Sequence, residues 1–273
     1  MTAFFGRLAD RIADIDSIVS VGLDPDTDRL PDEVAAADLP RWAFNRRIID
    51  ATAEHAAVFK PNAAFYEDPD GWHALEKTVA YAREQGVPVL LDAKRADIGN
   101  TSRQYAKILD RVDAITLNPF LGRDSLAPFL DREDAGCFLL CRTSNPGGAD
   151  VQNLELASGQ LVYERVADLA SEWNDNDNVG LVVGATTPDE LRAVRERVPD
   201  LPFLVPGVGA QGGDTEAAAR YATAATPAGD TSGAGLVNST RGIIFAGEDS
   251  DLDFDEAAGE AAADLKARLN EYR

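Results

Sequence analysis

The stretch 179–207, VGLVVGATTPDELRAVRERVPDLPFLVPG, decides the fold of this chain. It begins with an apolar run at 179–184 and ends with another at 202–207, and neither run alternates with polar residues. Continuous apolar runs are typical of strands that are covered on both faces of a sheet. Between them, 187–197 begins with a Thr-Pro pair followed by two acidic residues, which is a helix start signal. The stretch therefore predicts a strand–helix–strand unit with parallel strands.

The same unit repeats along the chain. We interpret eight apolar runs as strands, at 17–23, 56–60, 88–94, 114–118, 137–142, 179–184, 202–207 and 235–239. Helical patterns lie between and after them, at about 40–56, 71–86, 100–111, 123–131, 158–174, 187–197, 213–224 and 254–272. Eight such units in 273 residues predict an α/β fold, a (β/α)8 TIM barrel that forms a single domain over residues 1–273. A doubly wound open sheet is the alternative, but no G-x-G-x-x-G motif follows the first strand.

The charge balance limits the classes of partner. Asp and Glu total 47 against 26 Lys and Arg, which gives a formal net charge of -21. A sequence-independent nucleic-acid binder needs a basic surface, and an anionic membrane surface disfavours so acidic a chain. We therefore expect neither nucleic acid nor membrane as a partner. Only 5 of the basic residues are lysines. This acidic, lysine-poor composition is halophile-like, because high salt screens the self-repulsion of the surface.

The cysteines and the first residues bear on the compartment. Cys137 and Cys141 lie four residues apart on a predicted strand, roughly 13 Å from each other, so they cannot form a disulfide with one another. Two buried free thiols fit a reducing compartment. The first 17 residues carry Arg and Asp among apolar residues, unlike a signal peptide, and no run of 18 apolar residues occurs. We therefore expect a cytoplasmic protein. His55 and His73 lack clustered cysteine partners, so no zinc site is expected.

Polar residues follow most of the predicted strands at their carboxyl ends, which is where a barrel of this kind carries its chemistry. They are Asp24, Lys60, Asn62, Asp92, Lys94, Asp97, Asn118, the segment 142–145 and the segments 206–213 and 238–242. A purely structural scaffold would not require polar groups at one rim.

The third predicted strand carries the most informative motif, D-x-K-x-x-D. Asp92 and Lys94 lie two residues apart, so on a regular strand they share a face, which we expect to be the barrel interior near its mouth. A lysine there is desolvated and tends to lose its proton, while a neighbouring carboxylate opposes that loss. Asp97 follows the strand, and Lys60 adds a second ammonium group. The four predict an alternating charged array, with a structural salt-bridge cluster as the alternative.

The ends of the last two predicted strands favour an anion. Glycine-rich turns at 206–213 expose backbone N–H groups and allow close approach by a ligand. Arg241 follows the eighth strand and offers a guanidinium fork that suits phosphate oxygens. In many barrels the phosphate site follows strands seven and eight. A Pro/Gly/Ser-rich stretch at 226–235 predicts a surface loop, and the acidic run 248–256 predicts a solvated loop that enters the last helix.

Six stretches together resemble orotidine 5'-phosphate decarboxylase, in its longer bacterial and archaeal subgroup. They are GLDPD (22–26), FKPNAAFYE (59–67), LLDAKRADIGNTS (91–102), CRTSNPG (141–147), VPGVGAQGGD (205–214) and LVNSTRGI (236–243). They span most of the chain, and LDAKRADIGNT is the most specific. The resemblance implies a barrel that dimerises with shared active sites. It also implies conversion of orotidine 5'-phosphate to UMP and carbon dioxide, the last step of UMP synthesis, without metal or organic cofactor.

The resemblance also implies roles for individual residues. Lys94 matches the family's proton donor to C6, and Lys60, Asp92 and Asp97 match the rest of a charged tetrad. Asp97 is then supplied by the neighbouring subunit, together with the substrate contacts Ile98 and Thr101. Further substrate-binding positions are Asp24 for a ribose hydroxyl, Ser144 for the pyrimidine amide, Gln211 and Arg241 for the phosphate, and Pro206 and Gly242 lining the phosphate site.

Three rival functions remain open from the residues. A sugar-phosphate decarboxylase or aldol enzyme of the same superfamily shares D-x-K-x-x-D but uses a divalent metal. A Schiff-base aldolase would use Lys94 or Lys60 as its nucleophile, although flanking carboxylates oppose a neutral amine. A non-enzymatic barrel retained as an interaction scaffold needs no intact tetrad, so the presence of all four residues counts against it.

Overall fold

The computed structural model describes residues 4–209, 212–226 and 233–273, and in these ranges eight parallel strands form one sheet. The strands are β1 (Val19–Leu23), β2 (Ala56–Pro61), β3 (Leu90–Arg95), β4 (Ala114–Leu117), β5 (Gly136–Arg142), β6 (Val179–Val183), β7 (Phe203–Pro206) and β8 (Leu236–Ser239). Most of their residues are buried, as continuous apolar runs require, but four of the six residues of β3 are at least partly exposed. All eight predicted strands are confirmed.

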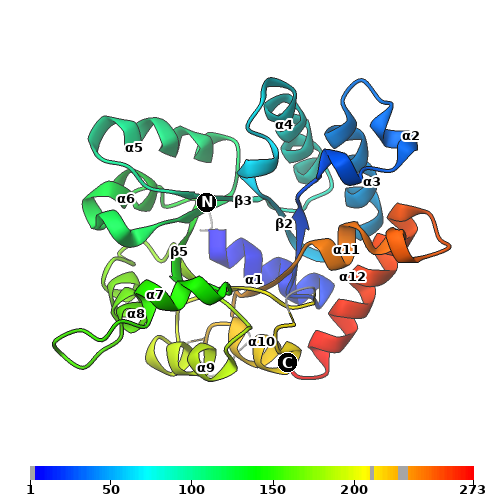
Figure 1. Ribbon diagram of the computed structural model, residues 1–273. Helices are drawn as coiled ribbons and strands as arrows, with labels where there is room; N and C mark the ends of the chain where they lie inside the picture. Colours follow the sequence, from blue (N-terminus) through cyan, green and yellow to red (C-terminus); the bar gives the residue numbers. More distant parts are fainter. Residues whose placement is uncertain (1–3, 210–211, 227–232) are drawn as a thin grey trace.

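The sheet closes on itself. Its order is β2-β1-β8-β7-β6-β5-β4-β3, so each strand lies beside its neighbours in the sequence. Parallel bridges from Phe59 to Val89 and from Asn62 to Asp92 join β2 to β3 and complete the ring. The fold is therefore a (β/α)8 barrel, as predicted, with its helices arranged around the strands (Figure 1). The alternative of an open doubly wound sheet is wrong.

Each β-strand is followed by helical structure. The α-helices are α1 (Phe4–Ile15), α2 (Asp32–Ala35), α3 (Pro40–Thr52), α4 (Pro69–Glu84), α5 (Gly99–Ala106), α6 (Arg123–Leu130), α7 (Ala149–Gln152), α8 (Val162–Glu172), α9 (Pro188–Arg197), α10 (Thr215–Ala222), α11 (Arg241–Ile244) and α12 (Phe254–Asn270). The predicted helices are all present, with ends that differ by a few residues. Short 3₁₀ turns follow several strands, and another, Ala246–Asp249 after α11, overlaps the start of the predicted acidic loop 248–256.

The helix predicted at 158–174 begins later, at Val162. The preceding residues form a turn, in which the N–H of Gly159 donates to the carbonyl of Leu156. Gly159 has a φ of 82°, in the left-handed region that ends regular helical structure for most residues. The helix begins where the Glu164 side chain accepts the N–H of Leu161 at 2.8 Å.

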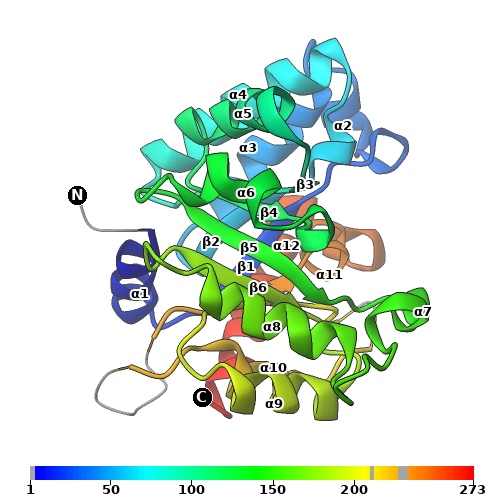
Figure 2. The same cartoon turned by 90° about the vertical axis from the view of Figure 1, so that its left-hand side faces the viewer.

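Helix α1 closes the amino-terminal end of the barrel, and it is not among the helices predicted from the sequence. Phe4 on its buried face lies against Gly136 at the start of β5, where an added Cβ would be 2.3 Å from Cδ1 of Phe4. The Arg11 side chain donates to the carbonyl of Ala56 at the start of β2. Figure 2 shows α1 at one end of the strands and α7 at the other. The end that bears the carboxyl termini of the strands is left for a site.

Cys137 and Cys141 are buried and form no disulfide within the described residues, as predicted. Across the described ranges, none of the helices is both long and apolar enough to cross a membrane.

Candidate active site

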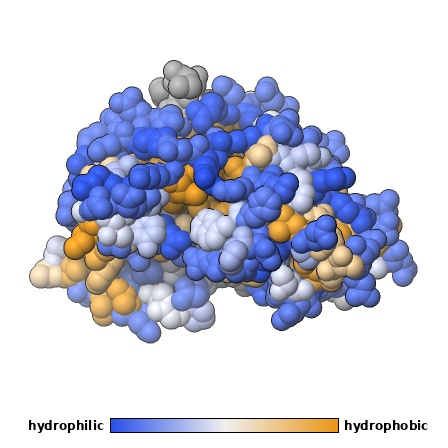
Figure 3. Space-filling view, turned by 90° about the horizontal axis from the view of Figure 1, so that it is seen from above, coloured by the Kyte–Doolittle hydropathy of each residue, from blue (hydrophilic) through white to orange (hydrophobic). Residues whose placement is uncertain are grey.

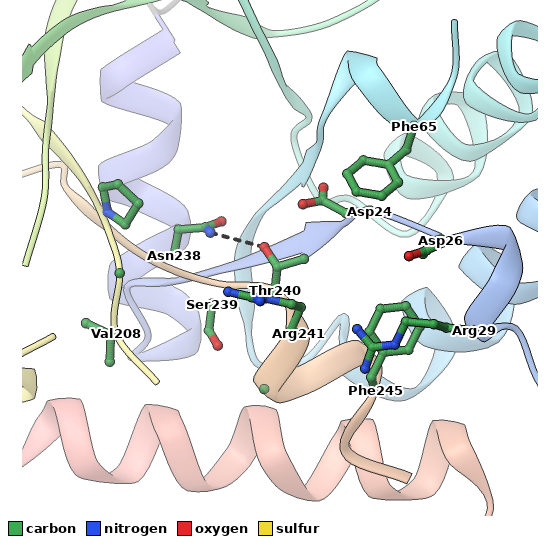
Figure 4. Close-up of a pocket in the computed structure, with 13 residues that line it drawn as sticks. Asp24, Asp26, Arg29, Phe65, Val208, Asn238, Ser239, Thr240, Arg241 and Phe245 are labelled. Carbon is green, nitrogen blue, oxygen red and sulfur yellow. Dashed lines mark hydrogen bonds between the residues drawn. The ribbon is translucent and has the colours of Figure 1, made fainter. Parts of the chain in front are cut away.

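Two adjoining cavities lie at the carboxyl-terminal end of the barrel in the part of the chain that the structure describes. One, of about 280 Å³, contains the charged side chains of β2 and β3. The other, of about 320 Å³, lies at the ends of β7 and β8 (Figure 4). Asp24, Pro206, Asn238 and Thr240 line both. The two cavities are therefore compartments of one elongated site, with charged groups at one end and a glycine-rich anion pocket at the other.

The first compartment brings together three of the four predicted charged residues. Nζ of Lys94 lies 2.6 Å from Oδ1 of Asp92, and Nζ of Lys60 lies 3.2 Å from Oδ2 of the same carboxylate. The side chains of Lys60 and Asp92 are only 6% and 14% exposed, whereas that of Lys94 is 48% exposed. The expectation that Lys94 is desolvated is therefore wrong. Lys60 is the buried lysine, and Lys94 lies at the rim because its strand bulges there.

Charges in this compartment stabilise one another. Burial by itself raises the pKa of Asp92, but the ammonium groups of Lys60 and Lys94 outweigh it and hold the pKa well below its usual range. Burial by itself lowers the pKa of Lys60, but the carboxylates of Asp92 and Asp24 raise it above its usual value. Asp92 is thus ionised and Lys60 protonated at neutral pH, which keeps a fixed charge pattern in a largely buried position.

Asp24 adds a second carboxylate to this cluster from the end of β1. Its Oδ1 is buried and accepts no hydrogen bond from the residues that the structure describes. Burial raises the pKa of Asp24, and the Asp92 carboxylate adds to this, while Lys60 opposes it. Figure 4 shows the side chain among the residues that line the second compartment. A buried acceptor without a partner, in the wall of a cavity, fits a ligand that brings a donor.

The carboxyl half of β3 is a bulge. Leu91 pairs with Ile115 and Arg95 pairs with Leu117, so three residues of β3 lie opposite the single residue Thr116 of β4. Lys94, in the bulge, has a φ of 49°, which is in the left-handed region. The side chains of Asp92 and Lys94 therefore do not follow the regular two-residue alternation of a strand. Their ion pair, and not a shared strand face, brings them into contact.

The Thr116 hydroxyl lies at the centre of this bulge. It accepts the backbone N–H groups of Ala93 and Lys94, at 3.0 and 2.9 Å, and donates to Oδ1 of Asp92 at 2.8 Å. Thr116 is not among the site residues predicted from the sequence. In the sequence, Thr116 stands out only as a hydroxyl-bearing residue inside an otherwise apolar run. That signal does not identify its partners on β3.

Three predicted residues, Asp97, Ile98 and Thr101, do not line either compartment. Asp97 accepts the N–H of Ile98 at 2.7 Å and forms no ion pair with another described residue. Ile98 is 66% exposed, and Thr101 is also exposed. In a single chain Ile98 and Thr101 therefore lie at the surface.

The second compartment contains the predicted anion-binding groups. Pro206, Arg241 and Gly242 line it, and Arg241 begins α11 directly after β8. Gly207 and Gly209 have φ values of 103° and 88°, conformations that favour glycine and form the turn after β7. The predicted residue Gln211 lies outside the described residues, as do 227–232 of the predicted loop 226–235.

Another arginine, Arg29, lines the same compartment, but its guanidinium group is already bound by other side chains. Its guanidinium donates to both carboxylate oxygens of Glu248, at 2.9 and 2.6 Å, and lies 3.8 Å from the ring centre of Phe245. This arrangement makes Arg29 part of the wall, and it leaves Arg241 as the arginine at the glycine-rich end.

Ser144 lines the first compartment, on the loop between β5 and α7. Two interactions anchor that loop. Buried Arg142 donates to Glu190 of α9 at 2.7 Å, and Oε1 of Gln152 accepts the N–H of Thr143 at 3.0 Å. The loop is thus held at the mouth of the barrel by side chains from two neighbouring helices. Among the described residues, no three His, Cys, Asp or Glu side chains are grouped as metal ligands.

Comparison with known proteins relates the whole chain to one family. Residues 17–251 match the family model "Orotidine 5'-phosphate decarboxylase / HUMPS family". The chain is 70% identical to the orotidine 5'-phosphate decarboxylase of Halorubrum lacusprofundi, over 99% of this chain and 100% of that protein. It is 67% identical to that of Haloarcula marismortui, over 99% of each. The structure of Leishmania donovani OMP decarboxylase superimposes with a TM-score of 0.80 at 38% identity, covering 98% of this chain and 99% of that one.

Proposed function

This chain belongs to the orotidine 5'-phosphate decarboxylase / HUMPS family, and we propose that it converts orotidine 5'-phosphate to UMP and carbon dioxide. The observation that carries the proposal is the elongated site. A Lys60–Asp92–Lys94 cluster lies at one end, and Arg241 lies at the other beside glycine-rich turns. A nucleotide that carries a carboxylate on its base and a phosphate on its ribose matches both ends.

The reaction breaks the bond between C6 and its carboxylate. The electron pair of that bond stays on C6, in the plane of the ring, where the ring does not delocalise it well. We propose that the Lys94 ammonium stabilises this charge and then transfers a proton from Nζ to C6, while carbon dioxide leaves. Its ion pair with Asp92, 2.6 Å long, holds the ammonium group in the charged compartment. No metal or organic cofactor is required for these steps.

Asp92 and Lys60 provide the electrostatic environment of this decarboxylation step. We propose that Asp92 lies next to the substrate carboxylate, whose charge leaves as carbon dioxide forms. Lys60, bonded to Oδ2 of Asp92, keeps that carboxylate ionised and fixed. Whether ground-state stress or preorganised electrostatics contributes more, the charges on Asp92 and Lys94 both favour the transition state.

The remaining predicted residues have substrate-binding roles in this proposal. The unpartnered Oδ1 of Asp24 accepts a ribose hydroxyl. Ser144, on its anchored loop, contacts the pyrimidine amide. Arg241 and Gln211 bind the phosphate, with Pro206 and Gly242 beside them. Phosphate binding far from C6 then contributes to catalysis by holding the base against the charged cluster.

We propose that the protein is a homodimer whose subunits share their active sites. Asp97, Ile98 and Thr101 would then complete the partner's charged cluster and substrate pocket. The exposure of Thr101 supports the proposal, as do two exposed hydrophobic residues, Ile98 and the 83% exposed Phe120.

The surface beside these residues also supports a dimer. Figure 3 looks onto the side where α4 and α5 lie, and it shows hydrophobic surface exposed within a mainly hydrophilic face. A groove between α4 and the segment 108–112 has an apolar floor and a charged rim. Trp72, Leu75, Val79, Ile108 and Val112 line it together with Glu76, Arg83, Asp110 and Arg111. Large apolar side chains in such a groove are typical of an interface between subunits.

Production of UMP from orotidine 5'-phosphate, with and without a chelator, tests the proposed function. We expect equal turnover in both conditions. Loss of turnover with chelator, restored by a divalent metal, would instead support the metal-dependent sugar-phosphate enzymes of the superfamily. Covalent trapping of substrate by borohydride at Lys94 or Lys60 would support a Schiff-base aldolase. No turnover under any condition would contradict the proposal. We also propose a cytoplasmic location and activity at high salt, which follow from the sequence composition.

A further inference from the structure

Two backbone N–H groups in the β3 bulge need a hydrogen-bond acceptor. Ala93 and Lys94 lie in the bulge, where the β3–β4 ladder skips from Leu91 to Arg95 and leaves their N–H groups without strand partners. Both groups donate to the hydroxyl oxygen of Thr116. Partly buried N–H groups that lose their acceptor are costly, and the left-handed backbone of Lys94 is itself unfavourable. The hydroxyl therefore stabilises a strained conformation directly beneath the Lys94 side chain.

The same hydroxyl also orients a carboxylate. A threonine hydroxyl has one proton and two acceptor positions. The two N–H groups occupy both acceptor positions, so the proton points to the third neighbour, Oδ1 of Asp92, at 2.8 Å. That oxygen also accepts from Nζ of Lys94, while Oδ2 accepts from Lys60. Each polar atom of this small network thus has a single donor or acceptor role. Thr116 is the rigid member of the network, because its side chain is buried in β4.

We infer that Thr116 is a positioning residue for the proposed reaction. Its hydroxyl holds the bulge that places the Lys94 ammonium at the rim, and it fixes the Asp92 carboxylate between the two lysines. Thr116 lines the charged compartment, but in this inference it acts through Asp92 and Lys94 and touches no reacting atom. The inference rests on the proposed function for its kinetic test, whereas its structural part stands on the hydrogen bonds alone.

Three variants test it. Thr116→Val keeps the shape and removes the hydroxyl, and Thr116→Ser keeps the hydroxyl. Thr52→Val is the matched control, because Thr52 is buried and its hydroxyl donates only to the carbonyl of Ile48 in α3, far from the site. We expect Thr116→Val to lower kcat about 100-fold while KM for orotidine 5'-phosphate changes less than about 3-fold. Thr116→Ser should stay within about 3-fold of wild type in kcat, and Thr52→Val should leave both constants unchanged.

A second measurement does not depend on activity. Hydrogen–deuterium exchange of the 92–95 amides should be faster in Thr116→Val than in wild type, and unchanged in Thr52→Val. If wild type makes no UMP, the proposed function fails, and this exchange result still tests the positioning role. Equal exchange in wild type and Thr116→Val would overturn that role.

The kinetic outcomes are equally decisive. Thr116→Val with kcat within about 3-fold of wild type, or Thr116→Ser as impaired as Thr116→Val, would overturn the inference. If Thr116→Val does not fold, Thr116→Cys replaces it, because a thiol of similar size is a much weaker hydrogen-bonding group. We then expect kcat of Thr116→Cys at least about 10-fold below that of Thr116→Ser, and equal values would contradict the role of the hydroxyl.

Discussion

Nζ of Lys94 lies 2.6 Å from Oδ1 of Asp92, an ion pair that joins a half-exposed ammonium to a mostly buried carboxylate. The other oxygen of Asp92 is bonded to Lys60, which is almost fully buried. The two lysine side chains therefore differ in how freely they can move. Lys60 is confined by its surroundings, whereas Lys94 projects from a bulge into the mouth of the barrel and can reach a ligand there. This difference favours Lys94 over Lys60 as the group that meets the substrate.

Replacing Lys94 with Ala is expected to abolish decarboxylation and leave the fold intact. The change removes both the stabilising charge and the proton donor, which should cost about 4 kcal/mol or more in kcat/KM, roughly a 1,000-fold loss. Turnover of orotidine 5'-phosphate measures the loss of activity, and the circular dichroism spectrum shows whether the fold is intact. Lys77→Ala, an exposed lysine of α4, is the control and should behave as wild type. Near-native turnover in the Lys94 variant would show that the proton donor is assigned wrongly.

Arg241→Ala is expected to weaken the reaction of the phosphorylated substrate far more than that of a phosphate-free nucleoside. A charged hydrogen bond to phosphate contributes about 1.5–3 kcal/mol, which corresponds to a loss of about 10- to 150-fold in kcat/KM. Arg29→Ala is the matched control, because Arg29 lines the same compartment but is bonded to Glu248. We expect a smaller and less phosphate-dependent effect there. Equal losses with both substrates would place Arg241 outside the phosphate site.

Mixed subunits test the shared site. Lys94→Ala and Asp97→Ala are each expected to be inactive as pure proteins. In a mixed dimer, one site would carry both changes and the other neither. Random exchange makes about half of the dimers mixed, each with one intact site of two, so activity should recover to about a quarter of native. Subunit exchange is verified separately with differently tagged chains. Exchange without any recovery would mean that Asp97 acts within its own barrel.

Asp24→Asn is expected to raise stability and lower activity. Burial raises the pKa of Asp24 in the folded state, and the Asp92 carboxylate adds to this. A group whose pKa is raised by folding favours the folded state below its unfolded pKa, and this contribution is lost as pH rises through the folded pKa. The charged Asp24 therefore costs stability at pH 7. The variant should gain about 0.5–2 kcal/mol in free energy of unfolding at pH 7, as single stabilising changes do.

The pH profile of denaturant unfolding checks this origin. The advantage of Asp24→Asn should shrink as pH falls through the folded pKa of Asp24 toward the ordinary value of about 3.9. At the same time kcat/KM should fall about 10-fold or more, because a buried acceptor for the substrate is lost. Asp264→Asn, an exposed position on α12, should change neither. A less stable Asp24 variant at pH 7 would mean that attraction to Lys60 outweighs the burial of the charge.

The sequence by itself determined the barrel and most of the rim. Strands buried on both faces must be apolar throughout, so their positions are visible as runs such as 179–184, and alternation with helices leaves few topologies. Residues that follow those runs, such as Asp24 and Arg241, then share one end of the barrel because all the strands are parallel. The family resemblance added roles for them, and the comparisons confirm the family. Helix α1 was missed because it precedes the first strand–helix unit and belongs to no repeat.

Only the tertiary structure decided how the charged groups meet. Two-residue alternation predicted a desolvated Lys94 beside Asp92, but it holds only for a regular strand, and the bulge in β3 is supported by a hydroxyl 22 residues away on β4. The burial of Lys60 and the proximity of Asp24 likewise depend on neighbours from β1, β2 and β3. Local sequence determines which residues reach the rim, because backbone periodicity is local. The ionisation and position of each group depend on contacts across strands, which come into existence only when the barrel closes.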